Sequence, residues 1–347
     1  YRAYESVHIQ PPGDSEAPNW QHTFFSNPYF EQEILVSPNE KDRFLGNVAI
    51  SYQLTEWLSL LARTGTDLWT DTRIVVDRYA RTKGGSFRAG RYSEEVLRNQ
   101  ESNSDFILKA DKQLKDFSLI VQVGGIHRTN YYKSNYARVN ELTIDRVYNL
   151  GNNASPNLNE SPIVESEMNS LFSSATLGYK NVLFLDITGR SDWSSTLPKE
   201  NNSFFYPSAA LSAIVSDMVP AMFNNVVSFL KLRGSWAKVG SDAPPYYLQQ
   251  VYNPKGLWNG SVPKFAESLQ IYNKDLKPEY TTGIEIGADI RFLNGRIGLD
   301  VNYYDQATKD QILAVDISRS SGYTGRLLNA GKITNKGIEI SLRGTLL

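Results

Sequence analysis

Apolar and polar positions alternate along this chain in runs of about ten residues that come in pairs. One pair lies at residues 44–68. Its apolar or small side chains take the even positions on both sides of a turn at Thr55-Glu56: Phe44, Gly46, Val48, Ile50, Tyr52 and Leu54, then Leu58, Leu60, Ala62, Thr64, Thr66 and Leu68. A period of two places alternate side chains on opposite faces of a strand. The pattern therefore predicts a β-hairpin with one apolar face.

The same pattern recurs and predicts five antiparallel hairpins. They are Arg43–Leu54 with Trp57–Trp69, Ser104–Leu114 with Phe117–Arg128, Asn169–Tyr179 with Val182–Arg190, Phe204–Ile214 with Phe229–Val239, and Tyr280–Phe292 with Arg296–Asp305. Asn294-Gly295 favours the last turn because both residues tolerate a positive φ. Asp217 before Val219-Pro220 predicts a short helix in the fourth connection. Runs at Ile333–Leu342 and, weakly, Phe30–Val36 bring the expected total to about twelve strands.

Strand length and loop asymmetry point to a membrane. Strands of about ten to twelve residues exceed the five or six usual in soluble sheets and suffice to cross an apolar band about 25 Å tall. Glu285, Asp289 and Arg291 lie on the polar side of one strand, which suits a wet barrel lumen. Short turns alternate with long loops near 70–103, 129–168, 191–203, 240–279 and 306–332. The sequence predicts an all-β, antiparallel transmembrane β-barrel wall with its function on the long-loop side.

The amino-acid composition excludes several classes of protein and kinds of site. A hydrophobic content of 41% with a mean hydropathy of -0.39 excludes a helical membrane protein, because no run approaches the roughly 18 apolar residues of a spanning helix. A net charge of -1 gives no reason to expect nucleic acid as a partner. The absence of cysteine excludes disulfides and thiolate metal sites. The 20 tyrosines suit strands and the membrane–water boundary.

The candidate chemistry is sparse. His8, His22 and His127 do not share the spacing of a metal site, so we expect no catalytic residue, metal or cofactor, and no enzyme. The acidic pairs Glu94-Glu95 and Glu165/Glu167 are expected in solvated loops. A basic, glycine-rich stretch at 83–91 is expected to be a flexible loop, with contact to anionic outer-leaflet lipid as the alternative.

Aromatic side chains in the expected loops are the better candidates for a binding site. Six occur where strand packing does not require them: Trp193, Tyr246, Tyr247, Tyr252, Trp258 and Tyr323. Flat rings beside Asn, Asp and Arg suit the recognition of sugars or peptides by stacking and oriented hydrogen bonds. The alternative is that these rings pack the loops together or form the outer aromatic girdle.

Several local sequences resemble the SusC/RagA group of TonB-dependent outer-membrane transporters, in that family's order. The segments are Asn27-Pro28-Tyr29-Phe30 ahead of Asp42-Arg43-Phe44, Arg190-Ser-Asp-Trp-Ser-Ser195 with Tyr206-Pro-Ser208, Leu230-Lys-Leu-Arg-Gly-Ser-Trp-Ala-Lys-Val-Gly240, Asn273-Lys-Asp-Leu-Lys-Pro-Glu279, and Ser321-Gly-Tyr323 with Asn329-Ala-Gly-Lys-Ile-Thr-Asn-Lys-Gly-Ile-Glu339. The resemblance covers residues 25–342. Pro278 stands where the family often has Trp, and Trp193 where Gly is common.

The resemblance implies a 22-stranded barrel closed by a plug domain. No segment of residues 1–347 resembles a plug, so we expect the whole chain to be part of a single barrel domain, with the plug and the remaining strands outside it. A complete 12-stranded barrel is the alternative.

The function implied is TonB-dependent uptake of oligosaccharides or peptides across the bacterial outer membrane. The expected partners are a SusD-like surface lipoprotein, outer-membrane lipid and, through the plug, the TonB complex. Two functional alternatives stay open: a non-transporting barrel with a structural or assembly role, and a soluble β-rich carbohydrate-binding protein.

Overall fold

The computed structural model describes residues 32, 35–78, 80–81, 87–88, 90–144, 146–155 and 157–345. The expected positions of His8, His22 and the segment 27–30 lie outside the described residues, as does most of the basic stretch at 83–91.

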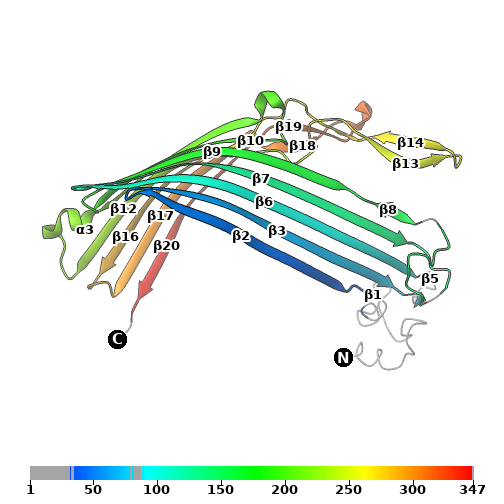
Figure 1. Ribbon diagram of the computed structural model, residues 1–347, viewed down its shortest axis with the longest axis horizontal. Coiled ribbons are helices and arrows are strands. Elements are labelled where there is room, and N and C mark those ends of the chain that lie inside the picture. Colours follow the sequence, from blue (N-terminus) through cyan, green and yellow to red (C-terminus); the bar gives the residue numbers. More distant parts are fainter. Residues whose placement is uncertain are drawn as a thin grey trace. The chain divides into compact units, whose positions relative to one another are not determined.

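One antiparallel sheet dominates the fold (Figure 1). Its strands are β1 (Leu35–Val36), β2 (Asn39–Thr55), β3 (Leu58–Asp77), β6 (Arg91–Leu114), β7 (Phe117–Val139), β8 (Leu158–Glu160), β9 (Ile163–Tyr179), β10 (Leu183–Ser194), β11 (Ser203–Ile214), β12 (Val227–Ser241), β16 (Glu279–Phe292), β17 (Ile297–Lys309) and β20 (Lys332–Gly344). Their order is β1-β3-β6-β7-β9-β10-β11-β12-β16-β17-β20, with β2 also paired to β3 and β8 to β7. All five predicted hairpins are present, and β20 pairs with β17 as the last strand.

The strands are longer than the alternation predicted. The return strand expected to end at Trp69 continues to Asp77, and the next begins at Arg91 rather than Ser104. Consecutive polar residues, and the apolar run Ile74-Val75-Val76, break the alternation there, although the strands continue. The loops expected at 70–103 and 129–168 are correspondingly shorter, and both acidic pairs expected in loops lie on β6 and β9. Of the expected strand at 30–36, only Leu35–Val36 is a described strand.

The chain divides into two compact units by its internal contacts. One comprises residues 1–46, 65–102 and 130–165; the other comprises 47–64, 103–129 and 166–347. The first has a small core of Tyr92, Val139 and Leu142. That the whole chain is part of a single barrel domain stays a prediction.

In the second unit, strand register sorts side chains onto two faces. Ile187 pairs with Ala175 and Ala209, so one face carries the residues that the alternation marked as apolar. On that face Ile286 is 60% exposed and Ile340 is 68% exposed. Large apolar side chains left uncovered by protein along whole strands indicate a surface that meets lipid.

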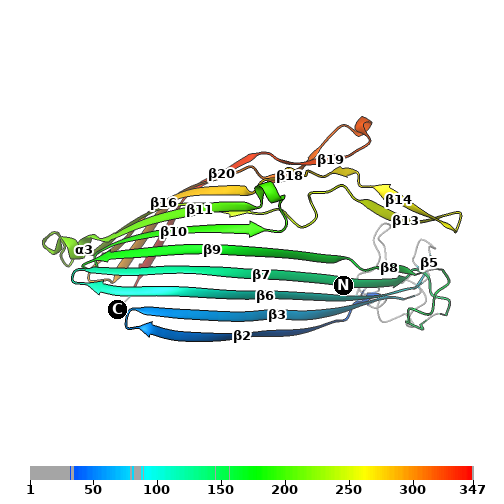
Figure 2. The same ribbon diagram turned by 45° about the horizontal axis from the view of Figure 1, so that its top comes forward.

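The connections in this unit differ strongly in length at the two ends of the strands. The short end carries α3 (Val215–Met218), followed by the 3-10 helix η2 (Pro220–Met222). Pro220 opens η2 as predicted, but the predicted cap was wrong, because Asp217 lies inside α3 and Val219 precedes η2 without a side-chain cap. The opposite end carries the hairpin β13 (Tyr252–Trp258) with β14 (Val262–Glu267), and a small sheet of β15 (Gln270–Ile271), β19 (Gly325–Asn329) and β18 (Ile312–Asp316) (Figure 2). The loops expected at 240–279 and 306–332 therefore contain strands of their own.

The remaining elements are short: β4 (Ala80–Arg81), β5 (Phe87–Arg88), η1 (Lys199–Asn201) and η3 (Arg319–Ser321). Within the described part of the chain, the helices are too short or too polar to cross a bilayer.

Candidate binding site on the long-loop side

The run Arg190-Ser-Asp-Trp-Ser joins neighbouring strands through its even-numbered side chains. Arg190 donates through Nε to Asp192 Oδ1 at 2.7 Å and through Nη2 to Ser170 Oγ at 3.0 Å. The Tyr206 hydroxyl donates to the other oxygen of Asp192, which is buried. Because the register aligns Arg190 with Tyr206, the two sequence segments that were paired by resemblance are one hydrogen-bonded network.

A second polar network fixes the base of the loop after β12. Ser194 donates through Oγ to Asp242 Oδ2 at 2.5 Å, and Thr196 Oγ1 donates to the same oxygen at 3.1 Å. Beside it lies an apolar cluster of Leu197, Phe204, Ala243 and Leu276. Leu276 is fully buried, so the Leu of Asn273-Lys-Asp-Leu-Lys-Pro-Glu279 is a core residue that holds the long loops on the strand ends.

Asn329 clamps the loops before β16 and before β18 together. Its Oδ1 accepts the backbone N–H of Lys277 at 2.8 Å. Its Nδ2 donates to the carbonyls of Lys277 at 2.7 Å and of Asp310 at 2.9 Å. Nearby, Glu279 Oε1 accepts the backbone N–H of Ile312 at 2.5 Å. Through these contacts two segments that resemble family motifs, 273–279 and 329–339, meet in the fold although they lie far apart in sequence.

Of the six aromatic residues predicted as a site, the structure brings Tyr252 and Tyr323 together around Glu267. Glu267 lies opposite Tyr252 in the β13–β14 hairpin. The Tyr323 hydroxyl donates to Glu267 Oε1 at 3.1 Å. This hydrogen bond, with the carboxylate charge, raises the pKa of Tyr323 above its ordinary value. Sequence reasoning missed Glu267; its cross-strand position is visible only once the hairpin register is known.

The other predicted residues lie apart. Trp258 ends β13 and is 67% exposed near the hairpin tip. Tyr247 packs against the apolar cluster and edge-on to Tyr272, with ring centroids 6.2 Å apart, so it is a packing residue in this loop. Tyr246 is exposed and has a φ of 66°. Trp193 lies on the apolar face of β10, away from the even-numbered network.

The opposite face of the sheet is polar and charged. Arg233 of β12 meets Asp300 of β17 through two parallel bonds of 2.9 and 2.7 Å. A Cβ on Gly287, which lies between them on β16, would be 2.6 Å from Arg233 Nε, so the glycine leaves room for this guanidinium. Arg63 and Asp105 form a comparable pair at 2.9 Å. Ionic side chains in rows across adjacent strands are typical of a wet lumen.

Among the residues described, no three His, Asp or Glu side chains gather closely enough to hold a metal ion. The His127 Nδ1 lies 2.8 Å from Asn169 Oδ1 and 3.7 Å from Glu167 Oε1. The long-loop side therefore presents aromatic rings, amides and carboxylates at its surface, and these groups suit the binding of a ligand.

Comparison with known proteins finds β-barrel proteins of the outer membrane, which have one apolar and one polar face. Residues 63–347 match the family model described as TonB dependent receptor-like, beta-barrel. TonB-dependent receptor P26 of Formosa agariphila is 24% identical over 334 residues, which are 92% of this chain and 33% of that receptor. TonB-dependent receptor SusC of Bacteroides thetaiotaomicron is 29% identical over 180 residues, 50% of this chain and 18% of SusC. The chain spans about a third of the length of the first curated relatives it matches.

Solved structures agree on the fold. The RagAB peptide importer in the closed-closed state has a TM-score of 0.82 at 20% identity, over 93% of this chain and 36% of that chain. The siderophore receptor PiuA from Acinetobacter baumannii gives a TM-score of 0.55 at 13% identity. The soluble carbohydrate-binding alternative is not favoured by these matches. The apolar face thus meets outer-membrane lipid, the polar face lines a lumen, and the chain belongs to the TonB dependent receptor-like β-barrel family, with SusC/RagA-type transporters among its relatives.

Proposed function

We propose that this chain forms part of the wall of a transporter that takes up oligosaccharides or peptides across the outer membrane with energy from TonB. The observation that carries the proposal is the match to the receptor barrel over residues 63–347, on strands whose second face is ionic. A polar lumen lets hydrated solutes pass, and no covalent chemistry is required.

The substrate classes rest on the loops and on the relatives. The cluster of Tyr252, Tyr323 and Glu267 presents rings and a carboxylate at one end of the β13–β14 hairpin, and the exposed indole of Trp258 lies near the tip of the same hairpin. Rings that are exposed rather than packed supply stacking surface for sugar faces or for aromatic and apolar peptide side chains. One solved relative by fold is named a peptide importer, which supports the peptide arm of the proposal.

The same surface is proposed to meet a SusD-like lipoprotein. The β13–β14 hairpin carries Tyr252, Leu257, Trp258, Val262 and Phe265, each more than half exposed. An apolar and aromatic hairpin of this kind suits a protein interface, in which Trp and Tyr are enriched. TonB would act through a plug domain, which supplies gating that the wall itself does not.

The test is uptake by cells that carry the intact gene, its deletion, or loop variants. We expect deletion to abolish growth on the imported polymer, and Trp258→Ala with Tyr252→Ala to reduce uptake at least tenfold while the barrel keeps its heat-modifiable gel mobility. Tyr247→Phe is the control, because Tyr247 packs inside the loop and the substituted Phe keeps the aromatic ring that makes this packing. Normal uptake after deletion would refute transport and leave a structural role. Unchanged uptake in the double variant would remove those residues from the site.

A further inference from the structure

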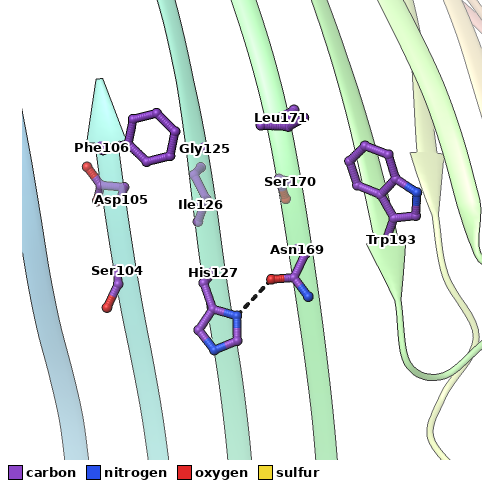
Figure 3. A pocket seen from close by; sticks show the side chains of 10 residues that line it. All are labelled: Ser104, Asp105, Phe106, Gly125, Ile126, His127, Asn169, Ser170, Leu171 and Trp193. Carbon is purple, nitrogen blue, oxygen red and sulfur yellow. Dashed lines mark hydrogen bonds between the residues drawn. The ribbon is translucent and has the colours of Figure 1, made fainter. Parts of the chain in front are cut away.

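A hollow of about 500 Å³ lies on the apolar face near the long-loop end of the second unit. Its walls are Phe106 of β6, Gly125 and His127 of β7, Asn169 and Leu171 of β9, and Trp193 of β10 (Figure 3). Asn169 pairs with Trp193 in the register, and Leu171 with Ser191, so all lie on the face of the exposed Ile187. The hollow therefore opens toward lipid rather than toward the lumen.

The part of the hollow nearer the short turns is apolar and is shaped by a missing side chain at Gly125 (Figure 3). A Cβ on Gly125 would lie 2.7 Å from the Phe106 ring and 3.4 Å from Leu171. The glycine thus lets the ring rest against the β7 backbone and leaves a channel between Phe106 and Leu171. Both side chains are more than half exposed, so they form walls that a hydrocarbon chain can contact.

The part of the hollow nearer the long loops is polar (Figure 3). Asn169 donates through Nδ2 to Glu167 Oε1 at 2.9 Å, so its Oδ1 accepts from His127 Nδ1. The second ring nitrogen of His127, Nε2, has no hydrogen-bond partner among the described residues and is free to meet a ligand. Neither Lys nor Arg is among the lining residues, and the lining Asp105 bonds Arg63 on the other face.

We propose that this hollow binds an outer-leaflet glycolipid, with an acyl chain between Phe106 and Leu171 and a sugar head group against Trp193, Asn169 and His127. Sugar hydroxyls both donate and accept hydrogen bonds, which matches the Asn169 amide, the His127 imidazole and the Glu167 carboxylate bonded to Asn169. A phosphate head group would face Glu167 without a cation to pair it. The indole of Trp193 supplies the flat apolar surface that a sugar ring can stack on.

Selectivity must come from the head group. An acyl chain gains no hydrophobic free energy by moving from the bilayer to a protein groove, because both are apolar. Hydrogen bonds at the polar end therefore decide whether one lipid is retained over its neighbours. This inference depends on the family and the outward face, and it is independent of the proposed uptake function.

The experiment uses the full-length protein in nanodiscs and counts retained lipids by native mass spectrometry. The probe is a glucosyl diacylglycerol, competed against phosphatidylethanolamine and phosphatidylglycerol with the same acyl chains. We expect at least a tenfold preference for the glucosyl lipid, reduced to near one by Asn169→Leu and by Trp193→Leu. The matched control is Trp236→Leu, because Trp236 is 39% exposed on the same face and Trp193 is 37% exposed.

Three results would overturn the proposal: no preference in the wild type, a preference for either phospholipid, or an equal loss in the Trp236 variant. The first would leave Trp193 as a member of the aromatic girdle only. If a variant fails to fold, a diazirine-tagged glucosyl lipid applied to the wild-type protein decides the matter. Labels on peptides around 104–106, 125–127 and 169–171 support the site, and labels elsewhere refute it.

Discussion

Replacing Asn329 by Ala is expected to release the loops that carry the aromatic cluster while leaving the strands intact. Three hydrogen bonds of 2.7 to 2.9 Å disappear, and with them the contacts to the N–H and C=O of Lys277 and to the C=O of Asp310. Each bond contributes about 0.5–1.5 kcal/mol net. Water replaces part of that because Lys277 and Asp310 are exposed. We therefore expect local opening to become easier by about 1–3 kcal/mol.

The assay is amide hydrogen exchange of the full-length protein, read by mass spectrometry. A change of 1.4 kcal/mol is a factor of ten, so the Lys277 amide should exchange roughly 5 to 150 times faster. Asn329→Asp keeps the acceptor for that amide and loses both carbonyl contacts, so we expect an intermediate rate. Asn335→Ala is the control, because the Asn335 side chain makes no hydrogen bond to any residue that the structure describes. Equal Lys277 exchange in the Asn329→Ala and Asn335→Ala proteins would refute the clamp.

Three further predictions concern the neighbouring networks. Tyr206→Phe removes the neutral donor to the buried Asp192 carboxylate and should lower stability by about 1.5–3 kcal/mol, measured as the temperature at which the heat-modified gel band appears. Leu276→Ala should cost about 2–5 kcal/mol because it leaves a cavity in a fully buried position, and a smaller shift of the denaturant midpoint would contradict the packing described. The Tyr323 hydrogen bond is complete below its ordinary pKa of 10.0 and is lost as pH rises through the higher folded value; Glu267→Gln should bring the phenolate absorbance transition back toward 10.0.

The strand framework could be predicted from the sequence because one physical requirement governs it. A sheet between lipid and water must alternate, and the strand at Tyr280–Phe292 does so from Gly283 to its end. Alternation failed beyond Trp69 and ahead of Ser104, where β3 and β6 continue with runs of like residues on both faces, polar at Thr70–Arg73 and apolar at Ile74–Val76. Backbone pairing does not depend on the polarity of side chains, so those extensions left no periodic signal.

The candidate site was less predictable, for a geometric reason. A tyrosine in a loop reads the same in sequence whether it packs, as Tyr247 does, or is exposed, as Tyr252 is. The partner that gathers two of the rings, Glu267, is defined by cross-strand register within a loop hairpin. Trp193 was grouped with the loop rings because its strand was expected to end at Arg190; the strand continues to Ser194, and parity then assigns Trp193 to the lipid side.

Strand parity gives the run at residues 190–194 two separate functions, and this separation makes the proposals independent of each other. Arg190, Asp192 and Ser194 anchor the loops through buried hydrogen bonds, whereas Trp193 faces lipid. Ser194 holds Asp242 at the start of the loop that carries Tyr252 and Glu267, so a Ser194 variant should weaken substrate binding without touching substrate, and amide exchange in that loop should rise. Trp193→Leu should alter lipid retention and leave both loop exchange and substrate binding unchanged. A Trp193 variant that loosens the loops would show that the two faces are coupled through the backbone of β10.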